Sequence, residues 1–299
     1  MKNEVNRAFM AKKKVLVLAA AMMVAAMMVA VTSAKAEVEF AYEAGADLVS
    51  AYIWRGQYNG GLSFQPEGLV GFDALDGALE FRAGAWANIG ASDWKFKTDG
   101  TDLPYDCNTY FVPELDFIAS VSAYGASVGY NAYFYCDDGS THQSEIWAGY
   151  NFSHLFGDKA GAYINWYTMI GGGGDRLLAP TMTDPLHEKQ AFSTYIELGY
   201  DYTFDDWGLT LGGQLGISPW QSVAYGNDGF AVVNLSLKAN KEWEFDKFTL
   251  DLYALGSLNP NGMITDKNDI DYNVYVNRAG DDKIGVQKLN GCIGLGIWF

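Results

Sequence analysis

The sequence of 299 residues has few of the features that mark several common protein classes. It holds a single uninterrupted apolar run, from Val15 to Val31, whereas a polytopic helical membrane protein needs several runs of about 20 apolar residues. Basic residues are scarce, with 20 Lys and Arg against 36 Asp and Glu, and nothing alternates basic with aromatic side chains. Nucleic acid is therefore a poor partner, because its phosphates repel so acidic a chain. Proline is scarce too, and 7 Pro beside 34 Gly favour turns and strands over long helices.

Histidine and cysteine number three each, which limits the chemistry that the chain supports. The histidines fall in separate connections, and the nearest approach to a hydrolase site is the segment 137–142, which a solvated loop explains equally well. The segment 269–280 begins like a calcium-binding loop but lacks the required Gly and the closing Glu. We therefore predict no enzymatic activity, no catalytic residue, no cofactor and no metal site.

Residues 1–36 are predicted to be a cleaved secretory signal peptide, and residues 37–299 a single mature domain. Three lysines at positions 12–14 precede the apolar run, which ends in the small-residue pattern of a cleavage site before Glu37. The alternative is an uncleaved anchor helix, although the run is at the short edge of a membrane span. Met10 is a second candidate for the start of translation. The leader carries six Lys or Arg and one Glu, so its removal takes the formal charge from -16 to -21.

Apolar and polar residues alternate with period two from Glu37 onward, between clusters of Gly, Asn, Asp and Ser, which is typical of antiparallel strands. Nine Trp, 19 Tyr and 17 Phe exclude disorder. Many of the alternating segments match the roughly 9–11 residues needed to cross a bilayer at a tilt, and short turns interleave with longer connections. The segments are 42–57, 61–73, 77–90, 109–121, 124–135, 143–152, 160–170, 189–204, 207–218, 229–240, 245–257 and 285–299. The pattern predicts an all-β fold, a transmembrane antiparallel up-and-down β-barrel of about 12 strands with its short turns toward the periplasm.

A soluble secreted β-sandwich or barrel is the main alternative, but it would rarely need twelve long strands. The face opposite the apolar one carries many charges and few bulky aliphatics, as a water-filled lumen would. On the last segment, Leu295, Ile297 and Phe299 share the apolar face. A terminal Phe after alternating apolar residues resembles the signal by which the barrel-assembly machinery recognises its clients.

One stretch of the chain resembles a known family. The segment from Asp47 to Gln57, followed by 84–88 and by 113–150, looks like the uncharacterised Gcw-type family of bacterial outer-membrane proteins. The match covers about the first half of the mature chain, plus the terminal aromatic, and its Tyr-x-[Trp/Phe]-Arg-Gly element falls on Tyr52 to Gly56. The resemblance implies an outer-membrane location. It transfers no catalytic residue, because the family carries no established activity.

Strand parity turns a set of charged residues, more acidic than basic, toward the lumen. The set comprises Arg55, Glu67, Glu80, Arg82, Glu114, Asp116 and Glu145, together with Asp47, Glu197, Asp201, Lys238, Lys247, Asp251 and Lys288. In one interpretation, Arg55 and Arg82 on the first and third strands face the nearby carboxylates across a constriction that favours cations or polar neutral solutes. In the other, the charges form an ion-pair network that fills the lumen. A barrel of twelve strands is intermediate in size between eight-stranded barrels, whose interior is packed, and sixteen-stranded barrels, whose interior is open. The number of strands therefore does not decide between the two interpretations.

Cys107 and Cys136 are predicted to form a disulfide. They fall opposite each other at the outer ends of the fourth and fifth segments, if these pair as a hairpin about residues 121–124, and export places them in an oxidising compartment. Cys292 is left unpaired.

The pattern as a whole predicts a porin-like protein of a Gram-negative outer membrane, a passive channel for small polar or cationic solutes. The alternative is a non-conducting structural or accessory subunit whose outer loops face a partner. An outer-membrane enzyme is the third and weakest hypothesis. The expected partners are outer-membrane lipid, the barrel-assembly machinery during biogenesis, and other outer-membrane proteins.

Overall fold

The computed structural model describes residues 37–90, 114–135, 142–156, 160–172, 175–177, 189–227, 229–260, 275–276, 283–284 and 289–299. The predicted signal peptide, Cys107, Cys136 and Lys288 lie outside these residues, so the signal peptide and the disulfide stay predictions. No helix in the described part of the chain is long and apolar enough to cross a membrane.

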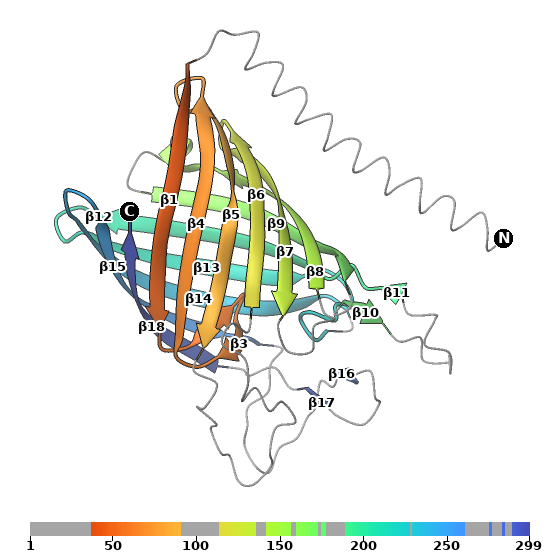
Figure 1. The fold of residues 1–299 in the computed structure, drawn as a ribbon. Coiled ribbons are helices and arrows are strands. Elements are labelled where there is room, and N and C mark those ends of the chain that lie inside the picture. Colours follow the sequence, from red (N-terminus) through yellow and green to blue (C-terminus); the bar gives the residue numbers. More distant parts are fainter. Residues whose placement is uncertain are drawn as a thin grey trace.

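Twelve antiparallel strands close into one barrel (Figure 1). They are β1 (Val38–Val49), β4 (Ser63–Ala74), β5 (Leu79–Gly90), β6 (Glu114–Ala123), β7 (Ala126–Tyr135), β8 (His142–Asn151), β9 (Ala160–Gly172), β12 (Thr194–Phe204), β13 (Leu209–Ser218), β14 (Ala231–Glu244), β15 (Thr249–Leu258) and β18 (Leu289–Trp298). Each strand pairs with its neighbour along the chain, and β18 pairs with β1 to close the sheet. The predicted up-and-down barrel of twelve strands is confirmed.

Smaller elements lie in the connections. They are the two-stranded pairs β2 (Tyr52–Trp54) with β3 (Gln57–Gly60), β10 (Arg176–Leu177) with β11 (Lys189–Gln190) and β16 (Tyr275–Val276) with β17 (Lys283–Ile284), and the short helix α2 (Ser153–Phe156). Connections at one rim are brief, such as 75–78, 124–125, 205–208 and 245–248, and those at the other rim are long, such as 91–113 and 259–288. We call these the short-turn rim and the long-loop rim. The start of β1 and the end of β18 lie toward the short-turn rim (Figure 1).

The prediction of a first strand over 42–57 is wrong at its C-terminal end, because β1 stops at Val49 and the chain turns back as the β2–β3 hairpin. Arg55 and Gly56 form the two-residue turn, with φ of 48° and 83°. Positive φ at both positions suits the twist of a two-residue hairpin, and Gly adopts it without a steric penalty. Arg55 therefore lies at a hairpin tip and not in the barrel wall.

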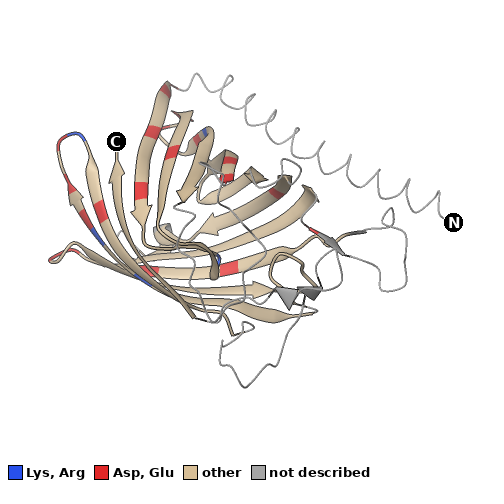
Figure 2. Cartoon of the chain, turned by 60° about the horizontal axis from the view of Figure 1, so that its bottom comes forward, with Lys and Arg blue, Asp and Glu red and all other residues tan. Residues whose placement is uncertain are grey.

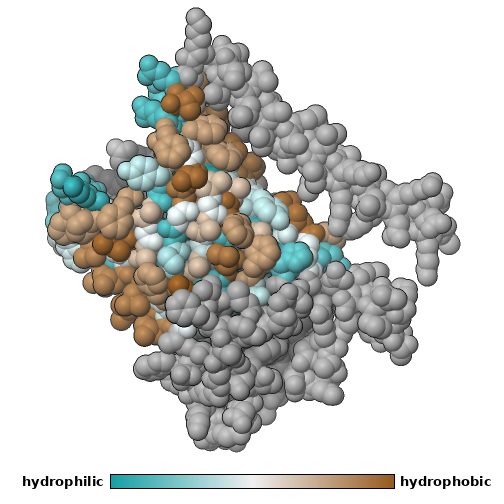
Figure 3. Space-filling model, in the orientation of Figure 1, coloured by the Kyte–Doolittle hydropathy of each residue, from teal (hydrophilic) through white to brown (hydrophobic). Residues whose placement is uncertain are grey.

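The outward face of the barrel is apolar. Residues directly opposite each other on neighbouring strands share a face, and the outward set includes large side chains that are more than 60 % exposed, such as Phe40, Leu237 and Ile293. Brown and tan side chains cover much of the wall in Figure 3, with teal ones at the strand tips. So many large apolar side chains exposed on one wall are rare on soluble monomers and typical of barrels that contact lipid.

The C-terminal strand carries the predicted assembly signal on its outward face. Leu295 is 45 % exposed, Ile297 lies two residues further on the same face, and the terminal Phe299 exchanges two backbone hydrogen bonds with Ala44 of β1. The ring of Phe299 also lies 6.3 Å from that of Phe248 in the β14–β15 turn. The signal faces the barrel's exterior, and its recognition by the assembly machinery stays a prediction.

Candidate functional site

The register gives the barrel a polar inward face. Along the described strands, Asp and Glu are more frequent than Lys and Arg (Figure 2). The register turns Glu67, Trp86, Asp116 and Tyr133 inward on four successive strands, because each lies directly opposite the next. The same parity turns Glu80, Arg82, Glu114 and Glu145 inward. Six of the seven charged residues predicted as lumen candidates thus lie on inward positions of the wall, and the seventh, Arg55, comes from the hairpin.

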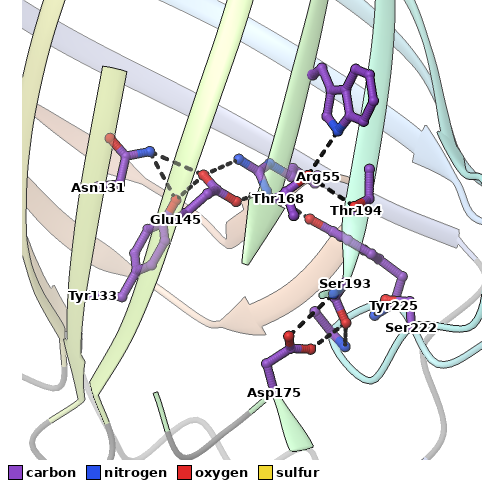
Figure 4. A network of polar contacts seen from close by, with 12 residues as sticks. Arg55, Asn131, Tyr133, Glu145, Thr168, Asp175, Ser193, Thr194, Ser222 and Tyr225 are labelled. Carbon is purple, nitrogen blue, oxygen red and sulfur yellow. Dashed lines mark hydrogen bonds and ion pairs between the residues drawn. The ribbon is translucent and has the colours of Figure 1, made fainter. Parts of the chain in front are cut away.

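Arg55 forms a buried ion pair with Glu145 of β8 (Figure 4). The guanidinium donates through both terminal nitrogens, at 2.6 Å and 2.8 Å, to the two oxygens of the carboxylate. The side chains are 9 % and 1 % exposed. Tyr133 and Asn131 of β7 also donate to the carboxylate, at 2.8 Å and 3.1 Å. Such a bidentate pair with its remaining oxygen sites satisfied fixes the position of the hairpin tip.

Aromatic rings enclose the Arg55 guanidinium. Its central carbon lies 3.8 Å from the ring centroid of Tyr167, 4.6 Å from that of Trp54 and 5.2 Å from that of Tyr195. The cation also donates at 2.7 Å to the hydroxyl of Tyr225, whose ring stacks on Trp54 at 5.8 Å. Burial raises the pKa of the Tyr225 phenol, which keeps this acceptor neutral. Cation–π contacts of this kind strengthen where water is absent.

The β2–β3 hairpin lies across the lumen, because it contacts strands on several sides of the barrel. Besides Glu145 on β8, its Gly56 carbonyl accepts a 2.7 Å hydrogen bond from Asn290 of β18. A Cβ on Gly56 would stand 2.7 Å from the side-chain oxygen of Asn234 on β14. Near the base of the hairpin, the ring of Tyr52 lies 5.4 Å from that of Trp86 on β5. The hairpin therefore lies inside the lumen toward the long-loop rim.

The connection between β13 and β14 packs on the hairpin from the long-loop side. Gln57 donates at 2.8 Å to the carbonyl of Ala224, and Tyr225 in the same connection is 1 % exposed. Ser193 holds the connection by accepting hydrogen bonds from the backbone N–H groups of Val223 and Ala224. Ser193 in turn donates to Asp175, which is fully buried (Figure 4). These contacts tie the outer loops to the hairpin.

Burial of the inward polar residues changes along the barrel axis. Many such residues toward the long-loop rim are at most 9 % exposed, among them Ser63, Gln65, Asn88, Glu114, Asp116, Glu145, Glu197, Asn234, Ser236, Ser257 and Asn290. Toward the short-turn rim the inward charged residues are half-buried or exposed, among them Glu43, Asp201, Lys238 and Asp251. The inward side chains are thus exposed toward the short-turn rim, and the hairpin narrows the lumen further along.

The expected constriction, with Arg55 and Arg82 facing one set of carboxylates, is wrong. Arg82 forms its ion pairs near the short-turn rim, at 2.9 Å with Glu43 and 2.5 Å with Asp73, while Arg55 bonds Glu145. The two cations occupy separate parts of the barrel because the chain leaves the wall after Val49. Lys247 lies in the β14–β15 turn and not on the wall.

The remaining predicted carboxylates lie apart from these ion pairs. Glu67 is opposite Trp86, and Glu80 is opposite Asp73 and Ser122. Glu114 and Asp116 are buried beside the hairpin, and one oxygen of Asp116 has no hydrogen-bond partner among the described residues. Nor do the described His, Cys, Asp and Glu side chains form a group of three or more that could hold a metal ion.

Sequence reasoning missed the aromatic residues around Arg55, above all Tyr167, Tyr195 and Tyr225. The available signal was the Arg55-Gly56 dipeptide, because a Gly within an alternating run marks a turn or a close backbone approach. His142 begins β8 on its outward face, with its ring 6.1 Å from that of Phe134, away from the lumen carboxylates.

No family model matches the sequence, and no curated protein matches it. Several solved barrels are similar in structure. The KdgM porin aligns with a TM-score of 0.38 and 6% identity over 86% of this chain and 97% of that chain. The COG4313 outer membrane channel from Pseudomonas putida F1 aligns with a TM-score of 0.39 and 13% identity over 88% of this chain and 94% of that chain. An anion-selective porin from Comamonas acidovorans aligns with a TM-score of 0.32 and 9% identity over 88% of this chain and 99% of that chain. The fold assignment stands on the strand pairing of the chain itself.

Proposed function

We propose that this protein is a channel of a Gram-negative outer membrane for small polar or cationic solutes, narrowed toward the outside by the β2–β3 hairpin. The observation that carries the proposal is the contrast between the two halves of the lumen. Inward charged residues such as Glu43 and Lys238 are exposed in one half, and the hairpin with its Arg55–Glu145 ion pair occupies the other. A charged, wet lumen with an internal constriction is the arrangement by which channels select solutes.

The acidic surplus supports a preference for cations. Glu67, Asp201 and Asp251 line the accessible half in addition to Glu43 and Asp73, the two carboxylates that engage Arg82. Fixed negative charge in a low-dielectric passage attracts cations and repels anions. The outer-membrane location, the cleaved signal peptide and membership of the Gcw-type family, whose Tyr-x-Trp-Arg-Gly element forms this hairpin, belong to the same proposal.

Planar-bilayer recording of the purified barrel tests the channel. We expect small, cation-selective currents from the wild-type protein, with selectivity falling when Glu67 and Asp201 are replaced together by Gln and Asn. The matched control is Glu244→Gln at the short-turn rim, where the charge is open to solvent and screened by salt. Absence of reproducible current from both the wild type and a variant without the hairpin would contradict the proposal.

A second candidate is a non-conducting barrel that acts as a structural or accessory subunit. The observation that favours it is the dense packing of the hairpin, with Tyr195, Tyr225 and Val233 in one cluster of buried side chains. In that case the outer connections serve as a surface for a partner. Co-purification from native membranes, with and without the 219–227 connection, would identify such a partner.

A further inference from the structure

Several aromatic rings in the lumen lie flat against the wall. A Cβ built on Gly199 would collide with three adjacent atoms of Tyr163, namely Cζ, Cε1 and the hydroxyl oxygen. A Cβ on Gly294 would collide with the same three atoms of Tyr253. Because adjacent ring atoms are equally close, each ring presents one face to its glycine and the other to the lumen. Tyr163 is directly opposite Gly199, and Tyr253 is directly opposite Gly294.

An ammonium group of the protein already occupies one of these faces. The Nζ of Lys238, on β14, lies 4.4 Å from the ring centroid of Tyr253. Gly294 covers the wall side of the ring, so the ammonium is over the lumenal side. Carboxylates accompany it, since the hydroxyl of Tyr253 donates at 3.4 Å to Asp47 and Asp251 lies two residues away on the same face. A ring face beside carboxylates is the environment that binds ammonium ions.

The ring of Tyr163 has similar surroundings. On β12 the inward residues on either side of Gly199 are Glu197 and Asp201. The Asp201 carboxylate lies over Gly212 of β13, on the side of β12 away from Tyr163 and near Lys238. Glu197 is 8 % exposed and accepts a 3.3 Å hydrogen bond from Asn165. The Tyr163 ring is half-buried and toward the short-turn rim, in the accessible part of the lumen. Among the described residues, no Lys or Arg lies over it.

We propose that the lumen binds alkylammonium ions on the free face of Tyr163, beside Glu197. The inference rests on the proposed function, since it names the solute class of the same lumen. Lys238 over Tyr253 shows which ligand such a site takes, because a lysine side chain is an n-butylammonium group. The ring contacts the alkyl stem and the cation, and the Glu197 carboxylate supplies the opposite charge. A neutral sugar would lack the charge that the carboxylate attracts, and an inorganic cation would lack the alkyl stem that the ring contacts.

A ligand-observed NMR titration of the full barrel in detergent with n-butylammonium chloride tests the site. We expect saturable binding with an upfield shift of the CH₂ protons next to the nitrogen, because these protons lie over the ring. Tyr163→Leu should weaken binding about 3- to 10-fold, the range of a partly desolvated cation–π contact. Tyr163→Phe should retain it. Glu197→Gln should weaken it further.

Lys238→Met supplies an independent test, because it frees the face of Tyr253. We expect the number of n-butylammonium ions bound to rise from one to two. An unchanged number in the folded variant would overturn the proposed equivalence of the two rings. Equal binding of n-pentanol, or a Tyr163→Leu barrel that binds like the wild type, would overturn the site itself. If the protein binds n-butylammonium at Tyr163 but conducts no current, the channel is refuted and the binding site is not. If the protein conducts current but does not bind n-butylammonium, the binding site is refuted and the channel is not.

Discussion

At the scale of single residues, the Arg55–Glu145 pair determines where the hairpin lies. Burying two charges is costly, and only the bidentate geometry with the added hydrogen bonds from Tyr133 and Asn131 offsets that cost. Removing one partner would leave the other buried and unpaired. The Arg82 pairs near the short-turn rim differ, because their carboxylates are 30 % and 53 % exposed and water screens them.

We therefore predict that Glu145→Gln lowers the free energy of opening the hairpin by about 3–5 kcal/mol, as found when one member of a buried ion pair is removed. Amide hydrogen exchange of residues 52–60 measures this free energy. Replacing both partners, Arg55→Met with Glu145→Met, should restore part of the protection, since no lone charge remains.

Arg82→Met is the control and should change the free energy of opening the hairpin by about 0–1 kcal/mol. The carboxylates paired with Arg82, Glu43 and Asp73, are partly exposed to water. If Glu145→Gln exchanges no faster than Arg82→Met, the ion pair does not hold the hairpin.

At the scale of the element, the β2–β3 hairpin depends on its turn. Gly56 has φ of 83° and stands close to Asn234, whereas Gly77, in the β4–β5 turn, has φ of 80° and open space around it. The two glycines thus share the same backbone strain on substitution and differ only in the neighbouring side chain.

This pair permits a matched prediction. Gly77→Ala should lower the free energy of unfolding by about 1 kcal/mol, because the alanine must adopt a strained backbone conformation. Gly56→Ala should cost more, and it should displace the hairpin because Asn234 must move. Unfolding by guanidinium measures the two costs, and proteolysis within residues 52–60 reports the displacement. Equal costs for both variants, with no new cleavage, would show that Gly56 is not packed on β14.

The strands were predictable from the sequence, but the hairpin was not. Alternation with period two follows from a wall that is apolar outside and polar inside, as on β18 from Leu289 to Trp298. Tyr52 to Trp54 continues the alternation of β1, so local pattern extends the strand past its true end. The contacts that pull the chain inward, to Glu145 and Tyr225, come from 90 and 170 residues away, and no local pattern contains them. The carboxylates could therefore be assigned to the lumen, but their partners could not.

At the scale of the whole molecule, the barrel has opposite faces for lipid and water. Large apolar side chains are exposed outward, and polar ones point to a lumen that the hairpin divides. The outward apolar face would be unfavourable in water, and a bilayer would be the surrounding that suits it.

If a bilayer surrounds the barrel, the free-energy cost of an outward charge depends on its depth in the membrane. Leu237, midway along β14, is 74 % exposed, and Leu237→Arg should destabilise the barrel in lipid vesicles by about 2–4 kcal/mol. Trp243→Arg, on the same outward face at the short-turn end of the strand, should add a charge penalty of only about 0–1 kcal/mol. The free energy of unfolding in vesicles is the measurement. A Leu237→Arg barrel as stable as the wild type would place this face in water.

Single-channel conductance with and without the hairpin tests most directly whether the barrel is a channel that the hairpin narrows. In the truncated barrel, residues 51–61 are replaced by a short Gly-Ser linker. We predict a several-fold larger, cation-selective conductance in the truncated barrel than in the wild type, because the hairpin narrows the long-loop half of the lumen. Equal conductance in the two folded proteins, or none in either, would contradict this prediction.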